Sequence, residues 1–289
     1  MNRPDDLHET IKSIYNCHDL PSEILILDNG SNNQTKHQYK KFINRFPNCK
    51  WFFSATNLGV SGGRNYLLKR TKSDIIIEID DDISIENKSL FNNVLEAFKE
   101  EDENVGILAF HIKNFHTRKR LRHEFPFLNK TKQLKKSMET GWFIGAGHAF
   151  RKTLVDKIGL YNNFYPYGHE EMDFSVRAIN SGFKIKFRSD LEIFHKISPK
   201  GRFVYDVELG SLLLFNRLKY VLINFPLLFF FTQLIIRGAQ LSIRYKSLNV
   251  IFFALNKLWL DRRYIVKTRK VISFKALIYL LRIRSQVIF

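Results

Sequence analysis

The sequence predicts an α/β protein in which helices flank a mostly parallel sheet, followed by a basic, amphipathic helical tail. Apolar runs of strand type alternate with segments of helical periodicity through most of the first 210 residues. Several runs end directly in an acidic or glycine-bearing turn. From about residue 211 the chain becomes strongly basic and rich in phenylalanine. We therefore expect a body, residues 1–210, and a membrane-associating helical region, residues 211–289.

The predicted body begins with an amphipathic helix over residues 5–16, whose Leu7, Ile11 and Ile14 lie on one face. In order, we then expect a strand at 23–27, a helix at 34–46, a strand at 51–54, a helix ending near residue 70, a strand at 75–79, a helix at 89–100 and a strand at 105–110.

The second part of the body is less regular. Residues 111–140 are basic without a clear period, so we expect an irregular segment, and residues 141–151 are spaced by glycines. A helix is predicted at about 170–181, ending at Gly182, followed by strands at 183–187 and 192–195.

The net charge of +18 indicates a polyanionic partner, such as nucleic acid, anionic lipid or a phosphorylated substrate. From residue 211 onward there are fourteen Lys and Arg but one acid, Asp261, so the tail carries +13 and the body only +5. The two cysteines, Cys17 and Cys49, are too far apart in sequence to indicate a metal cluster or a disulfide framework.

The tail contains a charge-free stretch, residues 220–236, interrupted by Pro226. A straight helix of that length would cover about 25 Å at ~1.5 Å per residue, less than the ~30 Å hydrocarbon core of a membrane. Helices lying in the membrane interface are therefore the favoured prediction, and a single span near 220–236 stays open as an alternative.

Three adjacent carboxylates, Asp80, Asp81 and Asp82, directly follow the predicted strand at 75–79. Their mutual repulsion is relieved best by a positive partner, and a divalent cation with a preference for oxygen is the simplest one. A solvated acidic turn is the alternative.

Four further segments carry polar residues at places where strands or turns end. They are Asp28-Asn29-Gly30-Ser31, the glycine loop from Asn57 through Gly63 and Arg64 to Asn65, the segment Trp142–Arg151, and the acidic segment Gly168–Arg177. Glycines and a helix N-terminus next to Arg64 favour a phosphate. The structural alternatives are an ordinary Asx turn at 28–31, a strand-to-helix connection with glycines for packing at 57–65, a packed glycine-rich strand at 142–151 and a helix-capping acid cluster at 168–177.

In this order, these motifs resemble family 2 of the glycosyltransferases, with the GT-A fold, especially its bacterial rhamnosyltransferase-like members. The likeness runs from about residue 2 to about 220. It implies a nucleotide-diphosphate sugar bound by Asp28, Ser31, Asn57, Gly63, Arg64, Asp80 and Asp81. It also implies a Mg²⁺ or Mn²⁺ ion held by Asp82, Asp80 and His195.

The resemblance further implies catalytic residues in the acidic segment. Glu171 matches the position of the catalytic base, where the family more often has Asp, and Glu170 stands beside it. Trp142, Gly145 and Gly147 match the segment lining the junction of donor sugar and acceptor. From the spacing of Asp173 and Arg177, at i and i+4, we expect an ion pair that holds the helix.

One part of the family pattern is missing at the front. Family members open with a buried strand before the Asn-Arg that stands here at residues 2–3, so the chain is expected to lack the first strand. Neighbouring strands would then lose ladder partners, which is costly for buried backbone groups. A start codon assigned too late or a truncated gene would explain the gap, and activity of this chain becomes doubtful.

The resemblance thus implies an inverting, metal-dependent glycosyltransferase at the cytoplasmic face of the bacterial inner membrane, held there peripherally by anionic lipid. Its acceptor would be a cell-surface glycan or a lipid-linked sugar, with no nucleic acid as partner. Two alternatives remain. One is a catalytically inactive, membrane-bound interaction protein. The other is a nucleic-acid-binding protein, which the Phe-rich character of the basic tail disfavours.

Overall fold

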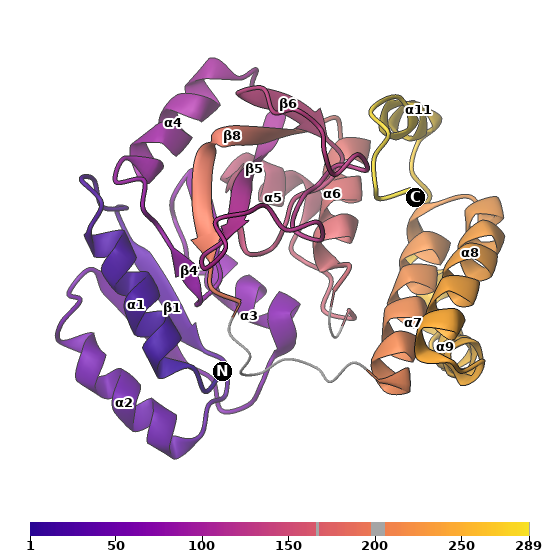
Figure 1. The fold of residues 1–289 in the computed structure, drawn as a ribbon, viewed down its shortest axis with the longest axis horizontal. Helices are drawn as coiled ribbons and strands as arrows, with labels where there is room; N and C mark the ends of the chain where they lie inside the picture. Colours follow the sequence, from indigo (N-terminus) through magenta and orange to yellow (C-terminus); the bar gives the residue numbers. More distant parts are fainter. Residues whose placement is uncertain (166–167, 198–205, 289) are drawn as a thin grey trace.

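The structure is a computed structural model that describes residues 1–165, 168–197 and 206–288 (Figure 1). Helices α1 and α2 lie at one side of the molecule, and α7, α8 and α9 lie together at the opposite side, with the main sheet between them. The α/β class and the helical tail predicted from the sequence are confirmed.

The helices are α1 (Pro4–Tyr15), α2 (Asn33–Ile43), α3 (Gly59–Leu68), α4 (Leu90–Glu100), α5 (Lys152–Ile158), α6 (Glu170–Asn180), α7 (Val207–Asn224), α8 (Leu227–Tyr245), α9 (Asn249–Leu260), α10 (Arg262–Thr268) and α11 (Phe274–Arg282). The strands are β1 (Ile24–Asp28), β2 (Cys49–Phe53), β3 (Ile75–Ile79), β4 (Ile83–Ser84), β5 (Val105–Asn114), β6 (Ser137–Thr140), β7 (Gly147–Arg151) and β8 (Lys184–His195).

The main sheet has the strand order β3-β7-β5-β8-β4, with β6 paired to β8. It is mixed rather than mostly parallel, which corrects the prediction. β5 and β8 are parallel, whereas β7 runs antiparallel to both β3 and β5. The reason is the connection from β5 to β7, which passes through the irregular segment and β6 instead of a single crossover helix, and so does not impose a parallel return.

The strands β1 and β2 form a separate parallel pair. Within the described residues, β1 pairs only with β2 and β3 pairs only with β7. Both strands line a cavity of about 610 Å³, together with apolar side chains of α1 such as Ile11 and Ile14.

Two apolar cores lie on opposite faces of the main sheet. Ile107 of β5 and Phe150 of β7 belong to one core, whereas their neighbours Leu108 and Ala149 belong to the other. This alternation follows from the two-residue period of a strand. The second core contains residues of α1 and α4, and the first contains residues of α5, α6, α7 and α11.

The tail is joined to the body through α7. Tyr220 and Phe225 at its C-terminal end belong to the first core of the body, whereas Leu214 and Leu218 pack with Val250 of α9 in a third, smaller core. Pro226, which has no backbone N–H to donate, separates α7 from α8 and divides the charge-free stretch between two helices. Among the described residues, no helix is both long and apolar enough to cross a membrane.

Several predicted elements differ in extent from those observed. The strands predicted at 183–187 and 192–195 are one strand, β8, whose ladder with β5 is interrupted between Phe110 and His111. A bulge of this kind breaks the sequence pattern without ending the strand. β5 extends to Asn114, and β6 lies in the segment predicted to be irregular. The remaining predicted helices and strands are present within a few residues of their expected bounds.

Candidate active site

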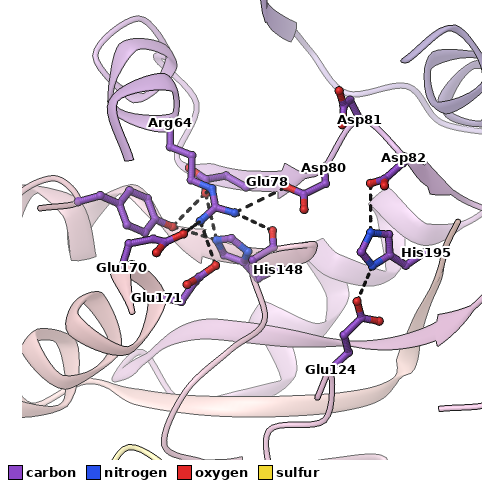
Figure 2. Close-up of polar contacts among 12 residues, drawn as sticks. Arg64, Glu78, Asp80, Asp81, Asp82, Glu124, His148, Glu170, Glu171 and His195 are labelled. Carbon is purple, nitrogen blue, oxygen red and sulfur yellow. Dashed lines mark hydrogen bonds and ion pairs between the residues drawn. The ribbon is translucent and has the colours of Figure 1, made fainter. Parts of the chain in front are cut away.

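The candidate site lies where β3 and β8 end and where α6 begins (Figure 2). Three acidic residues follow β3, His195 closes β8, and Arg64 reaches in from α3. Ends of strands in open α/β sheets are common places for ligands because the loops there are free to carry polar residues.

Asp80, Asp82 and His195 form a group that could hold a metal ion. One ligand atom from each of the three lies within 4.8 Å of those of the other two. Two carboxylates and an imidazole are a donor set suited to a divalent cation. The three residues predicted as metal ligands therefore converge in the fold.

Glu124 orients the ring of His195, and no motif in the sequence singled out this glutamate. Its Oε1 lies 2.5 Å from His195 Nδ1, while His195 Nε2 lies 3.1 Å from Asp82 Oδ1. Burial alone would lower the pKa of His195, but the hydrogen bonds to Asp82 and Glu124 outweigh it and raise the pKa to about 10. A carboxylate behind an imidazole is a common way to orient a metal-binding histidine.

Asp81 lies apart from this group. Figure 2 shows its carboxylate directed away from Asp80, Asp82 and His195. It forms an ion pair with Arg3, whose guanidinium also lies 3.0 Å from Asp82 Oδ2. Arg3 thus supplies part of the positive charge that the three adjacent carboxylates require.

Arg64 lies among four carboxylates. The distances from its guanidinium are 3.4 Å to Glu171, 3.5 Å to Glu78, 3.7 Å to Asp80 and 4.0 Å to Glu170. Figure 2 shows these side chains around Arg64. Arg64 also donates a hydrogen bond of 3.0 Å to the carbonyl oxygen of Gly145. Burial works against the charged form, but these carboxylates outweigh it and hold the pKa of Arg64 well above its ordinary value.

Glu78, one of these four carboxylates, belongs to a buried network with Tyr161 and His148. The hydroxyl of Tyr161 donates to Glu78 Oε2 at 2.9 Å, and His148 Nε2 lies 3.2 Å from the same oxygen. Burial tends to raise the pKa of Glu78, but contacts with His148, Arg64 and Tyr161 lower it overall. No sequence motif predicted this network, although a glutamate inside the isoleucine run of β3 is unusual enough to indicate a buried polar role.

Asp80 bridges the two groups. Desolvation raises its pKa to about 6, and the charges of Asp82 and Asp81 add to the effect, while Arg64 opposes it. Its side chain is nevertheless 42% exposed, unlike that of Asp82 at 4%. Asp80 is therefore the ligand candidate that solvent and a bound molecule reach most easily.

The two glutamates at the start of α6 differ in environment. Glu171 Oε1 accepts a hydrogen bond from Arg64 Nη1 at 3.4 Å, and its side chain is 16% exposed. Glu170 is almost fully buried, and its Oε2 has no hydrogen-bond partner. Burial and the neighbouring Glu171 raise the pKa of Glu170 to about 8. Glu170 therefore favours its neutral form more than an ordinary glutamate does, whereas Glu171 is the member of the pair that lies closer to Arg64.

Asp173 has the structural role predicted for it. Its Oδ2 accepts hydrogen bonds from Arg177 Nε at 2.8 Å and from Asn162 at 2.6 Å, and Asn224 of α7 donates to Oδ1. Arg177 also donates to the carbonyl oxygens of Ile158 and Leu160. These bonds fix α6, and with it the position of Glu171.

The three residues predicted at the donor–acceptor junction are not together. Gly145 lies directly at the Arg64–Glu171 pair. Gly147 is on β7, where an added Cβ would lie 2.1 Å from Ile193 Cδ1, so its small size serves core packing. Trp142 lies on the wall of a second cavity, where its Nε1 donates to Gln286 Oε1 at 3.1 Å.

The other predicted donor-binding residues cluster around the end of β1. Asp28 Oδ1 accepts a hydrogen bond from Ser31 N, whereas Asp28 Oδ2 is buried and without a partner. Asn57 accepts from the backbone of Gly59 and so caps its own loop. Gly63 faces Asn29, whose side chain joins this loop to the turn after β1.

Comparison with known proteins agrees with this arrangement. Residues 1–159 match the model of glycosyl transferase family 2. The chain is 35% identical over 161 residues to an uncharacterised protein of Haemophilus influenzae, covering 55% of this chain and 87% of that protein. It is 28% identical over 165 residues to UDP-Gal:alpha-D-GlcNAc-diphosphoundecaprenol beta-1,3-galactosyltransferase of Escherichia coli, covering 56% of this chain and 58% of that enzyme.

Among solved structures, the chain resembles a mannosyltransferase of Pyrobaculum calidifontis determined with GDP-Man and Mn²⁺. The TM-score is 0.59 at 15% identity, over 97% of this chain and 76% of that one. At this identity the likeness shows a shared fold and nothing about the substrate. The match of the family model to more than half of the sequence, together with the GT-A fold, shows that the chain belongs to glycosyl transferase family 2 and is a glycosyltransferase.

Proposed function

We propose that this glycosyltransferase moves a sugar, with inversion, from a nucleotide-diphosphate donor to a lipid-linked or cell-surface glycan acceptor. One observation carries the proposal. Glu171, the less buried of the two glutamates at the start of α6, lies against Arg64, and Arg64 lies 3.7 Å from Asp80 of the Asp80, Asp82 and His195 group. A base, a cation and a metal-binding group are thus adjacent in one site.

On the donor side, the proposal assigns Asp28, Ser31, Asn57, Gly63, Arg64, Asp80 and Asp81 to nucleotide-sugar binding. The buried and unpartnered Oδ2 of Asp28 supports this assignment, because it is an acceptor ready for a ribose hydroxyl or a base N–H. Arg64 offers a guanidinium that is suited to phosphate oxygens. Gly63, with no side chain, lets a ligand approach the backbone closely.

Asp80, Asp82 and His195 are the residues we assign to a divalent ion. A mixed oxygen and nitrogen set favours Mn²⁺ over Mg²⁺, because Mg²⁺ prefers oxygen donors and retains its waters. Bound there, the ion would neutralise the charge of the diphosphate leaving group. Glu124 would keep the Nε2 of His195 directed toward the ion.

We assign the role of general base to Glu171. It would accept the proton of the acceptor hydroxyl as that oxygen attacks the anomeric carbon from the face opposite the diphosphate. A carboxylate at a helix N-terminus is stabilised in its ionised form. Glu170 would act differently from the sequence-based expectation, by filling the space behind Glu171 in its neutral form.

The acceptor and location are inferred from the tail, residues 211–289, which we propose as the membrane-associating region beside the 1–210 catalytic region. Its helices expose large apolar side chains, including Leu228, Ile235, Phe252 and Trp259, among many cations. Such a surface suits peripheral attachment to anionic lipid at the cytoplasmic face of a bacterial membrane better than binding to nucleic acid. The diphospholipid-linked acceptor of the Escherichia coli relative supports the same direction.

Glu171→Gln tests the catalytic proposal. We expect at least a ~100-fold loss of sugar transfer, because general-base catalysis contributes about 10²–10⁴-fold, with donor binding kept within about twofold. The matched control is Glu103→Gln, an exposed glutamate remote from the site in sequence, which should retain full transfer. Transfer at the wild-type rate by the Glu171 variant would remove this residue from its role.

A sedimentation assay tests the membrane proposal. We expect the protein to sediment with vesicles of phosphatidylglycerol and to bind much less to neutral vesicles, because part of the attraction is electrostatic. Tighter retention by a DNA or RNA duplex than by the anionic vesicles, at the same salt concentration, would contradict this assignment.

A further inference from the structure

A second cavity, of about 580 Å³, lies where the body meets the tail helices. Its walls come from the loop before β6, the first turn of α6, helices α7 and α8, and Gln286. Within the described part of the chain, they include five cationic side chains and no Asp or Glu. The cations are Arg122, Lys130, Arg217, Arg237 and Arg244.

Arg217 of α7 is the buried member of this group. It is 7% exposed, its Nε donates to Gln233 Oε1 at 2.9 Å, and its Nη1 lies 3.8 Å from Met172 Sδ. Its Nη2 is buried and has no hydrogen-bond partner. No ion pair between described residues includes Arg217. A buried guanidinium without a carboxylate is costly, and an anion in the cavity would offset that cost.

Burial and the crowding of positive charge in the cavity lower the pKa of two of its cations. Burial, with repulsion from Arg237, lowers the pKa of Arg217 to about 10, so the group stays charged at neutral pH. Lys130 lies on the same wall, and burial together with Arg122 and Arg120 lowers its pKa to about 8. Five cationic groups exceed what one phosphate needs, which favours a ligand with two linked phosphates.

The cavity adjoins the candidate base through one helix turn. Glu171 lies against Arg64 on the donor side, whereas His169 and Met172, which flank the glutamates at the start of α6, line the cavity. The indole of Trp142, held by Gln286, lies on the same wall and offers a flat face for a sugar ring. A ligand with phosphates in the cavity would place an attached sugar near the start of α6.

The same helix that lines the cavity also carries apolar side chains to the surface. α8 contributes Arg237 and Leu241 to the cavity wall and exposes Leu228, Phe231 and Ile235. The cavity wall itself also carries apolar side chains, Leu128, Leu213 and Leu241. An anionic ligand with a long apolar chain would contact both the cations and these apolar residues, whereas an inorganic anion would contact only the cations.

We propose that this cavity is the acceptor subsite and that it binds the diphosphate group of a lipid-linked sugar, with Arg217 at its base and Arg122 and Arg244 at its exposed side. The inference rests on the proposed function, since it names the acceptor class of the same enzyme. It assigns the phosphates of acceptor and donor to two different places, one on each side of the start of α6.

The test measures binding of farnesyl diphosphate to the full chain by calorimetry, without donor or metal, and compares it with farnesol and with inorganic pyrophosphate. The double variant Arg122→Glu/Arg244→Glu changes exposed residues, so its fold should be retained. We expect it to weaken farnesyl diphosphate binding by about tenfold or more, because two charge-assisted contacts are reversed. The matched control Arg263→Glu alters an exposed arginine of α10 outside the cavity and should change binding by less than about twofold.

Arg217→Gln provides a second variant with a smaller steric change, and circular dichroism shows whether it folds. Equal binding of farnesol, or equal binding by wild type and the double variant, would overturn the proposal. Inorganic pyrophosphate that binds as tightly as farnesyl diphosphate, with the same response to the variants, would assign a free diphosphate and overturn the lipid-linked ligand. Manganese-dependent hydrolysis of a nucleotide sugar, measured in parallel, reports on the proposed function separately.

Discussion

Gly145 lies so close to Glu171 that a methyl group on its Cα would be 2.1 Å from Glu171 Oε1. The same methyl group would lie 2.5 Å from Arg64 Nη2. The absence of a side chain at residue 145 is therefore what allows the arginine and the glutamate to meet. Both contacts involve ends of flexible side chains, so the site can be disturbed there without breaking the fold.

Gly145→Ala should consequently reduce sugar transfer by about 100-fold, because displacement of a catalytic group by about 1 Å can cost that much. Its stability should stay within about 1 kcal/mol of wild type. Gly147→Ala is the matched contrast, since its methyl group would meet Ile193 in the core and should cost about 1–3 kcal/mol. Transfer assays and urea denaturation separate the two effects, and an active Gly145→Ala enzyme would contradict the proposed position of Glu171.

Manganese should stabilise the protein through Asp80, Asp82 and His195. At a concentration of about 100 times the Kd, a ligand specific for the folded state adds about 2.7 kcal/mol. We expect Asp82→Asn to lose this increment in a thermal-shift titration with MnCl₂. Asp81→Asn should retain it, because Asp81 pairs with Arg3 and lies outside the group. The comparison of each variant with and without metal cancels the effect of the substitution on the apo protein. A loss of the increment in both variants would count against the assignment.

Glu170 should make the protein less stable as pH rises. Its pKa is about 8 in the folded state because of burial and Glu171, whereas an unfolded chain has an ordinary glutamate. Below pH ~4 both states are protonated; between pH ~4.5 and ~8 only the folded state keeps the proton, so stability falls with rising pH. In wild type, the free energy of unfolding should fall between pH 5 and pH 8. In Glu170→Gln this fall should be smaller by about 1–3 kcal/mol, as measured by urea denaturation at the two pH values. Glu103→Gln, on an exposed side chain, should leave the pH profile unchanged.

The cavity between β1 and β3 should accept a larger side chain. Ile77 lines it, and Ile77→Phe should raise the free energy of unfolding by about 0.5–2 kcal/mol, as cavity-filling changes commonly do. Ile107, fully buried in β5 and outside the cavity, is the control, and Ile107→Phe should cost about 1–3 kcal/mol by overpacking. Equal destabilisation by both changes would show that the space beside β1 closes in solution.

Much of the fold was predictable because its signals are local. The apolar faces of α1, the isoleucine run of β3 and the Ser-Gly end of α6 each depend on neighbours in the sequence. The bulge of β8 and the antiparallel course of β7 were not predictable, since both depend on which strands they pair with. The metal-binding group was anticipated from its three residue types and their resemblance to the family.

By itself, the sequence determined the order of helices and strands, the acidic turn at residues 80–82, the charge asymmetry of body and tail and the family resemblance. Only the tertiary structure decided that Arg64 meets Glu171 across 107 residues and that Glu124 lies behind His195. It also decided that Glu170 is buried with a raised pKa and that Nη2 of Arg217 lies in a cationic cavity without a partner among the described residues. The physical reason is that turn chemistry and periodicity are properties of adjacent residues, whereas burial and charge pairing arise when distant surfaces pack together.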